Sequence, residues 1–429
     1  VLAPVDTAIA TPPPPKYAGL EGLRAFYAAL QRGREQVRVA HYGDSSIEGD
    51  LITASFRDSL QQRFGGAGVG FAPIVNPISG FRRSLRHSFS QNWHHCPLSA
   101  ANEQGLPRGL SGEYASTWLP PPDSLRSGLD SLVRDSSGQE ATDEGHWVFY
   151  GGAKLFSTTR RLPSVRLFYA APLPDSTGIR PPAGSVYFRR QGEQARSPLT
   201  AGGTVNEALL SQTTLSRISL YFQLPPTQAI YGVSLESPDG IIVDNFPSRG
   251  NSGSGLLRIP APVLRDFQRY LDYDLVMLQF GLNVLNPKMT DYTWYEREMI
   301  RVIRRFRETI PEAAILVLGP SDRAIKRQGR MQTDPSVPRI TEALRRAAET
   351  TGAGFFSFYE AMGGAGAMVD WVEERKPRLA NLDYTHFNFA GAREAAFLLL
   401  DYLLAGYDEY QKTPIEPEFI ESIPAPKPN

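Results

Sequence analysis

The sequence has few of the features, such as cysteines, an excess of one charge or long apolar runs, that would assign the protein to a class directly. It has 429 residues and a single cysteine, Cys96, so no disulfide can form within the chain. Lysine and arginine together number 45, and so do aspartate and glutamate, which leaves no net charge. This balance excludes the strongly basic composition of many nucleic-acid-binding proteins, and we expect no nucleic-acid partner.

Long hydrophobic runs are also missing. Apolar stretches such as 395–400 are far shorter than the ~20 residues that cross a membrane as a helix, so we expect no transmembrane segment. Prolines gather near the ends, in TPPPP at 11–15 and IPAPKPN at 423–429, where they predict extended tethers. The start at Val1 favours a mature exported protein, and we expect a secreted or periplasmic, cell-envelope location.

Two parts of the chain alternate short apolar runs with segments of helical period. We expect strands at 37–43, 274–281, 313–320 and 352–358, and helices at 51–64, 292–309, 337–351 and 388–404. Such alternation predicts an α/β domain, in which helices cover both faces of a parallel sheet.

The middle of the chain has a different texture, rich in Pro, Gly, Ser and Thr. Short alternating runs predict strands at 146–152, 164–170, 184–190, 217–224 and 230–237, which is typical of an all-β sandwich. We therefore predict a β domain inserted into the α/β domain. The predicted division is an N-terminal extension at 1–19, α/β parts at 20–98 and 241–410, the insertion at 99–240, and a tail at 411–429.

The stretch HYGDSSIEGD, 41–50, follows the first predicted strand and contains two adjacent hydroxyls, Ser45 and Ser46. Loops at the carboxyl ends of parallel strands form the ligand-binding edge of open α/β sheets. A serine there has two possible roles. It caps the following helix by accepting a backbone N–H, or it attacks a substrate as a nucleophile.

A nucleophilic serine needs a base, and the base needs a group that orients it. Of the six histidines, only His386 has an aspartate three residues before it, Asp383 in DYTH. Acyl transfer also needs hydrogen-bond donors for the oxyanion. Asn283 in GLN and Gly253 in SRGNSGSG are the candidate donors, and Gly250 is the second choice in that glycine-rich loop. Alone, each of these patterns has a plain structural explanation, and capping is the favoured role for the serine.

Taken together and in order, these motifs resemble the four blocks of the SGNH (GDSL-type) hydrolases. The blocks are GDS at 43–45, the glycine loop at 253, GxN at 281–283 and DxxH at 383–386. The resemblance implies a flavodoxin-like α/β/α domain without cofactor or metal. It also implies a Ser45–His386–Asp383 triad, with an oxyanion hole formed by Asn283 and the N–H groups of Ser45 and Gly253. Ser46 is then left with a local structural role.

Within that family, the chain is most similar to bacterial peptidoglycan and polysaccharide O-acetylesterases. Their β-sandwich, of carbohydrate-binding-module type, falls between the first and second blocks, as the insertion does here. The resemblance implies a serine acetylesterase whose partner is an acetylated carbohydrate. One departure is Val284, where several relatives have an acidic residue. A non-catalytic carbohydrate-binding or scaffold protein and an O-acetyltransferase with the same triad remain the alternatives.

Other motifs are best interpreted structurally. HHC at 94–96 has no partner motif for a metal site, and the glycines at 65–70 are interpreted as a helix stop and turn rather than a phosphate loop. Asp322 follows a predicted strand and is either a turn residue or a residue at the edge of the site. Trp294 and Tyr295 either line a sugar-binding groove or pack at the start of a helix.

Overall fold

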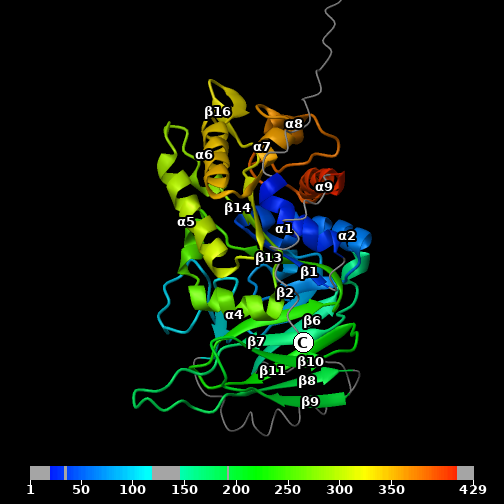
Figure 1. Ribbon diagram of the computed structural model, residues 1–429, viewed down its shortest axis with the longest axis vertical. Helices are drawn as coiled ribbons and strands as arrows, with labels where there is room; N and C mark the ends of the chain where they lie inside the picture. The colour runs from blue at the N-terminus through cyan, green and yellow to red at the C-terminus, as the bar shows by residue number, and fades with distance from the viewer. Residues whose placement is uncertain (1–19, 33–35, 118–144, 191–192, 413–429) are drawn as a thin grey trace, which may run out of the picture.

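The computed structural model describes residues 20–32, 36–117, 145–190 and 193–412. The proline-rich stretches at 11–15 and 423–429 lie outside these residues. In the view of Figure 1, a helix-rich part lies above a part built of antiparallel strands. The division of the chain into the domains named above stays a prediction.

A five-stranded sheet forms the centre of the helix-rich part, and all of its neighbouring strands are parallel. Its order is β13 (Gly240–Pro247), β1 (Gln36–Gly43), β14 (Leu275–Gln279), β15 (Ala314–Gly319) and β18 (Gly354–Ser357). Counted along the chain, this is strand order 2-1-3-4-5, the flavodoxin-like arrangement. The predicted α/β class with a parallel sheet is therefore confirmed. In this arrangement, ligands bind where the order reverses, between β1 and β14.

Helices cover both faces of this sheet. One face packs against α1 (Leu20–Gln31), α2 (Thr53–Phe64), α7 (Phe358–Ala361), α8 (Ala367–Glu373) and α9 (Phe389–Lys412). The other face packs against α4 (Ala261–Leu271), α5 (Thr293–Thr309) and α6 (Ser336–Thr351). In α5, Met299, Val302 and Phe306 recur at helical spacing and are buried, which is the pattern that predicted this helix. Helices α1 and α4 were not predicted.

Two antiparallel sheets form the second part. The first contains β2 (Gly68–Ala72), β4 (His94–Cys96), β5 (Tyr114–Ser116), β7 (Val165–Tyr169), β10 (Asn206–Ser211) and β12 (Ile230–Glu236). The second contains β3 (Leu85–Phe89), β6 (His146–Gly152), β8 (Ser185–Arg190), β9 (Glu193–Pro198) and β11 (Arg217–Gln223). Apolar side chains of both sheets, Leu167 and Leu220 among them, share one buried core. A separate hairpin joins β16 (Ala324–Arg327) to β17 (Arg330–Thr333).

The antiparallel sheets begin well before residue 99, where the insertion was predicted to start. Strand β2 pairs with β12, and β3 and β4 also precede residue 99. The glycines at 65–70 were interpreted as a helix stop and turn. Helix α2 does end at Phe64, with Gly65 as its C-cap, but β2 begins at Gly68. A Cβ at Gly70 would lie 2.0 Å from Asp244 Oδ1, so a residue without a side chain lets β2 approach β13 this closely.

A buried ionic network joins the parallel sheet to the antiparallel one. Arg38 of β1 contacts Asp244 of β13 at 2.8 Å and Glu236 of β12 at 2.7 Å. All three side chains are almost completely buried. Helix α4 lies at the same junction in Figure 1, and its Phe267 packs against Phe168 of β7. The two parts of the molecule therefore share polar and apolar contacts around one core.

Candidate active site

The structure brings Ser45, His386 and Asp383 into one hydrogen-bonded chain. Ser45 begins the 3₁₀ turn η1 (Ser45–Asp50), directly after β1, and His386 lies 341 residues later in the loop before α9. Ser45 Oγ is 3.1 Å from His386 Nε2, and His386 Nδ1 is 2.8 Å from Asp383 Oδ2. This is the geometry that a serine nucleophile, a general base and an orienting carboxylate require.

Asp383 is held by the local backbone as well as by the imidazole. Its Oδ1 accepts the N–H groups of Thr385 and His386, both at 3.0 Å. Partial burial would raise the pKa of Asp383, but these hydrogen bonds and the one from the His386 ring hold that pKa below its ordinary value. An ionised Asp383 favours the tautomer with a proton on Nδ1, which leaves Nε2 free to accept the Ser45 proton.

Ser46 has a local structural role. Its Oγ donates to Asp44 Oδ1 at 2.7 Å, and its backbone N–H donates to the same oxygen at 2.9 Å. Asp44, rather than a serine, is thus the N-cap of the turn that carries Ser45. The regular helix α2 begins at Thr53, two residues later than predicted, because the chain first makes this 3₁₀ turn.

The candidate oxyanion donors meet at the same sheet edge, but they donate to protein acceptors in this structure. Asn283 lies on η5 (Leu282–Val284) after β14, and its Nδ2 donates to Asp44 Oδ2 at 2.9 Å and to the Asn251 carbonyl at 3.1 Å. The Gly253 N–H donates to Asn251 Oδ1 at 2.8 Å. An oxyanion role for Asn283 or Gly253 therefore requires one of these hydrogens to be shared or redirected.

The sequence reasoning missed two residues that organise these donors. Asn251 accepts from both Asn283 and Gly253, and Asp44 links Asn283 to the turn of Ser45. Asp44 is almost fully buried, and burial raises its pKa. The hydrogen bonds from Ser46 and Asn283 lower that pKa, but the effect of burial is larger. The available signals were the Asp of GDS itself and the Asn before the glycines, a residue type that often bonds to a nearby backbone N–H.

The remaining sequence candidates lie outside this hydrogen-bonded chain. Asp322 is buried, accepts hydrogen bonds from Thr333 and from the Met368 N–H, and has its pKa raised by burial. Tyr295 is buried and donates to the Ser252 carbonyl at 2.7 Å, so it supports the glycine loop, whereas Trp294 is exposed. His94–Cys96 forms strand β4. Among the described residues, no cluster of three or more His, Cys, Asp or Glu side chains is placed to hold a metal ion.

Two hollows flank the turn of Ser45, and both are lined in part by Gly49 and Asp50 of η1. A cavity of about 250 Å³ extends toward the antiparallel part, where His95 and Glu113 line it. A larger groove of about 760 Å³ runs between α2 and α9. Both hollows therefore reach the C-terminal end of η1, while Ser45 itself lines neither of them.

The chain resembles known proteins in part of its sequence and in its fold. Residues 227–394 match the model of the GDSL-like Lipase/Acylhydrolase family. The solved structure titled "Peptidoglycan O-acetylesterase in action" has a TM-score of 0.67 and 21% identity, over 92% of this chain and 98% of that chain. A crystal structure of an acetyl xylan esterase has a TM-score of 0.29 and 16% identity, over 37% of this chain and 79% of that chain. A search of curated proteins gave no match.

The match to this family covers residues 227–394, less than half of the chain, and supports an esterase activity. The matched residues contain the glycine loop, Asn283 and the Asp383–His386 pair, while Ser45 lies outside the match. The place of Ser45 in the site therefore rests on its contact with His386. None of the helices in the described part of the chain combines the length and the apolarity that a membrane crossing requires.

Proposed function

We propose that the protein is a serine esterase that removes O-acetyl groups from a carbohydrate by way of an acyl-enzyme. The observation that carries this proposal is the contact of Ser45 Oγ with His386 Nε2 at 3.1 Å, in a ring that Asp383 orients. A serine that served only as a helix cap would need no histidine. Capping of this turn is already the role of Asp44.

In the first half of the reaction, Ser45 Oγ attacks the ester carbonyl carbon while His386 Nε2 takes the hydroxyl proton. Asp383 stabilises the resulting imidazolium without accepting the proton itself. The Ser45 N–H, at the start of a 3₁₀ turn, has no partner within that turn and is the first oxyanion donor. Asn283 and Gly253 supply the others. Collapse of the tetrahedral intermediate transfers the proton from His386 to the departing sugar hydroxyl and leaves acetyl-Ser45.

In the second half, His386 takes a proton from water, and the resulting nucleophile attacks the acetyl carbonyl. The second tetrahedral intermediate releases acetate, and the proton returns from His386 to Ser45 Oγ. The protein residues are sufficient for every proton transfer in this cycle. No cofactor takes part in it.

The carbohydrate class is proposed from the architecture. The structure that matches over 92% of this chain carries a title naming a peptidoglycan O-acetylesterase, and the match includes the antiparallel part. We propose that the antiparallel sheets help to hold a polysaccharide such as peptidoglycan. We also propose that the protein works outside the cytoplasm, where such polymers are found.

The test is release of p-nitrophenol from p-nitrophenyl acetate by the wild-type protein and by two neighbouring variants. Ser45→Ala should remove activity to the background level, while Ser46→Ala should retain most of it, because the Ser46 hydroxyl faces Asp44. Full activity in Ser45→Ala would refute the mechanism. A fully folded wild type without activity would refute the esterase assignment and favour a carbohydrate-binding protein.

A further inference from the structure

Two exposed phenylalanines stack beside the proposed triad. Phe81 ends the 3₁₀ turn η2 (Ser79–Phe81), and Phe389 begins α9, three residues after His386. Their ring centroids are 5.0 Å apart, with 29° between the ring planes. The two residues are 44% and 41% exposed, although apolar rings of this size are usually buried when they serve only to stabilise a fold.

The stack lies close along the chain to the proposed nucleophile and to the proposed base. Phe81 packs against Gly49, which lies four residues after Ser45, at a kink in the segment Ser45–Asp50. Gly49 has φ +64°, and a Cβ there would lie 2.3 Å from Phe81 Cδ1, so the ring occupies the space that a side chain would fill. The stack thus contacts the chain four residues after Ser45 and includes the residue three positions after His386.

Arg83 adds a positive charge to this surface. Its guanidinium carbon is 4.5 Å from the centroid of the Phe389 ring, and it forms no hydrogen bond or ion pair with any described residue. Its neighbour Arg82 differs, because that side chain is buried and contacts the Asp50 carboxylate. Arg83 and Phe389 line the groove of about 760 Å³ between α2 and α9.

The acidic residues of the groove leave Arg83 without a partner. Asp50 pairs with Arg57, and Asp58 accepts hydrogen bonds from Thr158 and Gln62, each at 2.7 Å. Glu394 also lines the groove, on α9, but it forms no ion pair with Arg83. A guanidinium that lies on an aromatic ring keeps its N–H edges available for a bidentate contact with a carboxylate.

We propose that Phe81, Phe389 and Arg83 form a subsite for a sugar residue next to the acetylated one, and that this sugar carries a carboxylate. The negative faces of the rings suit the polarised C–H groups on the apolar side of a pyranose, and Arg83 suits the acidic substituent. This inference rests on the proposed esterase function. It specifies that the substrate is an acidic glycan chain, of which at least two sugar units contact the enzyme.

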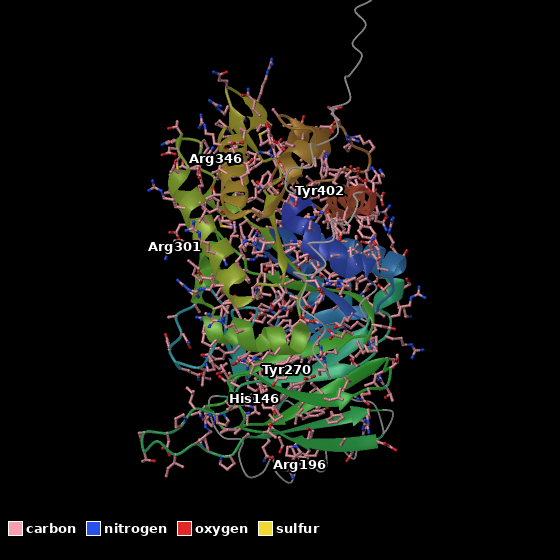
Figure 2. The ribbon with its side chains drawn as sticks, in the orientation of Figure 1. His146, Arg196, Tyr270, Arg301, Arg346 and Tyr402 are labelled. Carbon is pink, nitrogen blue, oxygen red and sulfur yellow. The ribbon has the colours of Figure 1, made fainter. Side chains whose placement is uncertain are left out.

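The experiment compares three substrates that share the acetyl ester. p-Nitrophenyl acetate contains no sugar, chemically O-acetylated polygalacturonate carries carboxylates, and O-acetylated xylan is neutral. The variants are Phe81→Ala, Arg83→Gln and, as a matched control, Tyr270→Ala. Tyr270 is an exposed aromatic residue at the end of α4, beside the antiparallel strands (Figure 2) and remote from Ser45 in sequence.

The expected results separate the two components of the subsite. Phe81→Ala should lower kcat/KM for both polymers about tenfold, the equivalent of one good aromatic contact, and leave p-nitrophenyl acetate hydrolysis within about twofold. Arg83→Gln should lower kcat/KM only for the acidic polymer, and added salt should weaken the preference of the wild type for that polymer. Tyr270→Ala should leave p-nitrophenyl acetate hydrolysis and the ratio of acidic to neutral polymer unchanged.

Other results would overturn the proposal. If Phe81→Ala slowed all three substrates equally, the stack would be a structural clamp between η2 and α9. If Arg83→Gln left the ratio of acidic to neutral polymer unchanged, the carboxylate assignment would be wrong. Binding of polygalacturonate to Ser45→Ala protein in an affinity gel tests the subsite without catalysis. If the wild type did not hydrolyse p-nitrophenyl acetate, the proposed esterase function would be wrong. If the Ser45→Ala protein did not bind polygalacturonate in the gel, the proposed subsite would be wrong.

Discussion

The side-chain amide of Asn283 donates a hydrogen bond at 2.9 Å to the carboxylate of Asp44, the residue directly before Ser45. Asp44 also accepts two hydrogen bonds from Ser46. One buried carboxylate therefore fixes the turn of the proposed nucleophile relative to the loop of a proposed oxyanion donor. The loops follow β1 and β14, the two strands between which the strand order reverses.

Replacing Asp44 with asparagine should impair catalysis more than stability. An amide in this position presents an NH₂ group toward at least one of the three donors that the carboxylate accepts, so Ser45 and Asn283 should shift relative to each other. Small displacements of reacting groups lower rates about 10²-fold, and we expect a loss of that size in kcat for p-nitrophenyl acetate. Asp58→Asn is the matched control, because Asp58 accepts side-chain hydrogen bonds on α2 without contacting Ser45. Wild-type kcat in Asp44→Asn would contradict this role.

Replacing Asp383 with asparagine should lower kcat by about 10²- to 10⁴-fold, because the amide favours the wrong tautomer of His386. The lower end is the better expectation, since Asp383 and His386 are about half exposed and water screens their interaction. Asp291→Asn is a matched control. Asp291 accepts the Thr293 N–H and hydroxyl in a similar local turn, without a histidine partner. Equal kcat values for the two variants would show that Asp383 does not orient the base.

The parts of the site that were predictable are those set by local spacing or by the ends of strands. DxxH places the Asp383 carboxylate on the backbone N–H and the ring of His386 within a single turn of chain. Ser45 and Asn283 follow strands that a parallel sheet brings to one edge, so their proximity followed from the alternation of strands and helices. The direction in which each loop side chain points could not be predicted from this alternation. Asn251 accepts from both candidate donors because of the path of its loop, and no periodicity reports that path.

The fold shows the same limit. The glycines at 65–70 were interpreted as a helix stop and turn because they follow a predicted helix, whereas β2 needs glycine to approach Asp244 and Leu235 on other strands. That contact joins residues more than 160 positions apart, so local propensity cannot report it. Helix α4 was missed although its Val263, Leu264, Phe267 and Leu271 make a regular buried stripe. The short helix starts directly after a proline-flanked turn and gave too few helical periods to stand out.

Replacing Glu236 with glutamine should destabilise the fold without affecting the proposed active site. Burial alone would raise the pKa of Glu236, but the attraction of Arg38 and Arg166 lowers that pKa to about 2. Removal of the charge leaves Arg38 with one carboxylate fewer in a buried setting, which typically reduces the free energy of unfolding by about 3–5 kcal/mol. Denaturant unfolding measures the change.

Glu207→Gln is the control for this stability experiment. Glu207 pairs with the same Arg166 at 3.3 Å but is partly exposed, and exposed ion pairs contribute only about 0–1 kcal/mol. Equal losses for the two glutamate variants would mean that the junction between the sheets is not held by the buried network. Hydrolysis of p-nitrophenyl acetate by the folded Glu236→Gln protein should match the wild type.

Acidification should destabilise the protein before any carboxylate of the network is protonated. Burial lowers the pKa of His41 to about 4 and that of His87 to about 3, both from an ordinary value of 6.5. As pH falls below 6.5, the unfolded chain therefore binds protons that the folded chain does not, and the free energy of unfolding falls. Each histidine contributes at most about 1.4 kcal/mol per pH unit until the pH reaches its folded pKa. Glu236 adds its own loss only below about pH 4.5. Asp44 and Asp322 act in the opposite direction, because burial raises their pKa and the folded chain binds their protons more readily than the unfolded chain.

The variant His87→Phe separates this effect from the others. The phenyl ring can keep the stack on Tyr150 but cannot bind a proton or donate to the Ile74 carbonyl, as His87 does at 3.0 Å. At pH 7 the variant should be less stable by about 1–3 kcal/mol, because a buried carbonyl loses its donor. Between pH 6 and 4.5, its free energy of unfolding should fall less steeply than that of the wild type, by at most about 1.4 kcal/mol per pH unit. Parallel curves for the two proteins would show that His87 binds a proton equally well in the folded and unfolded chains.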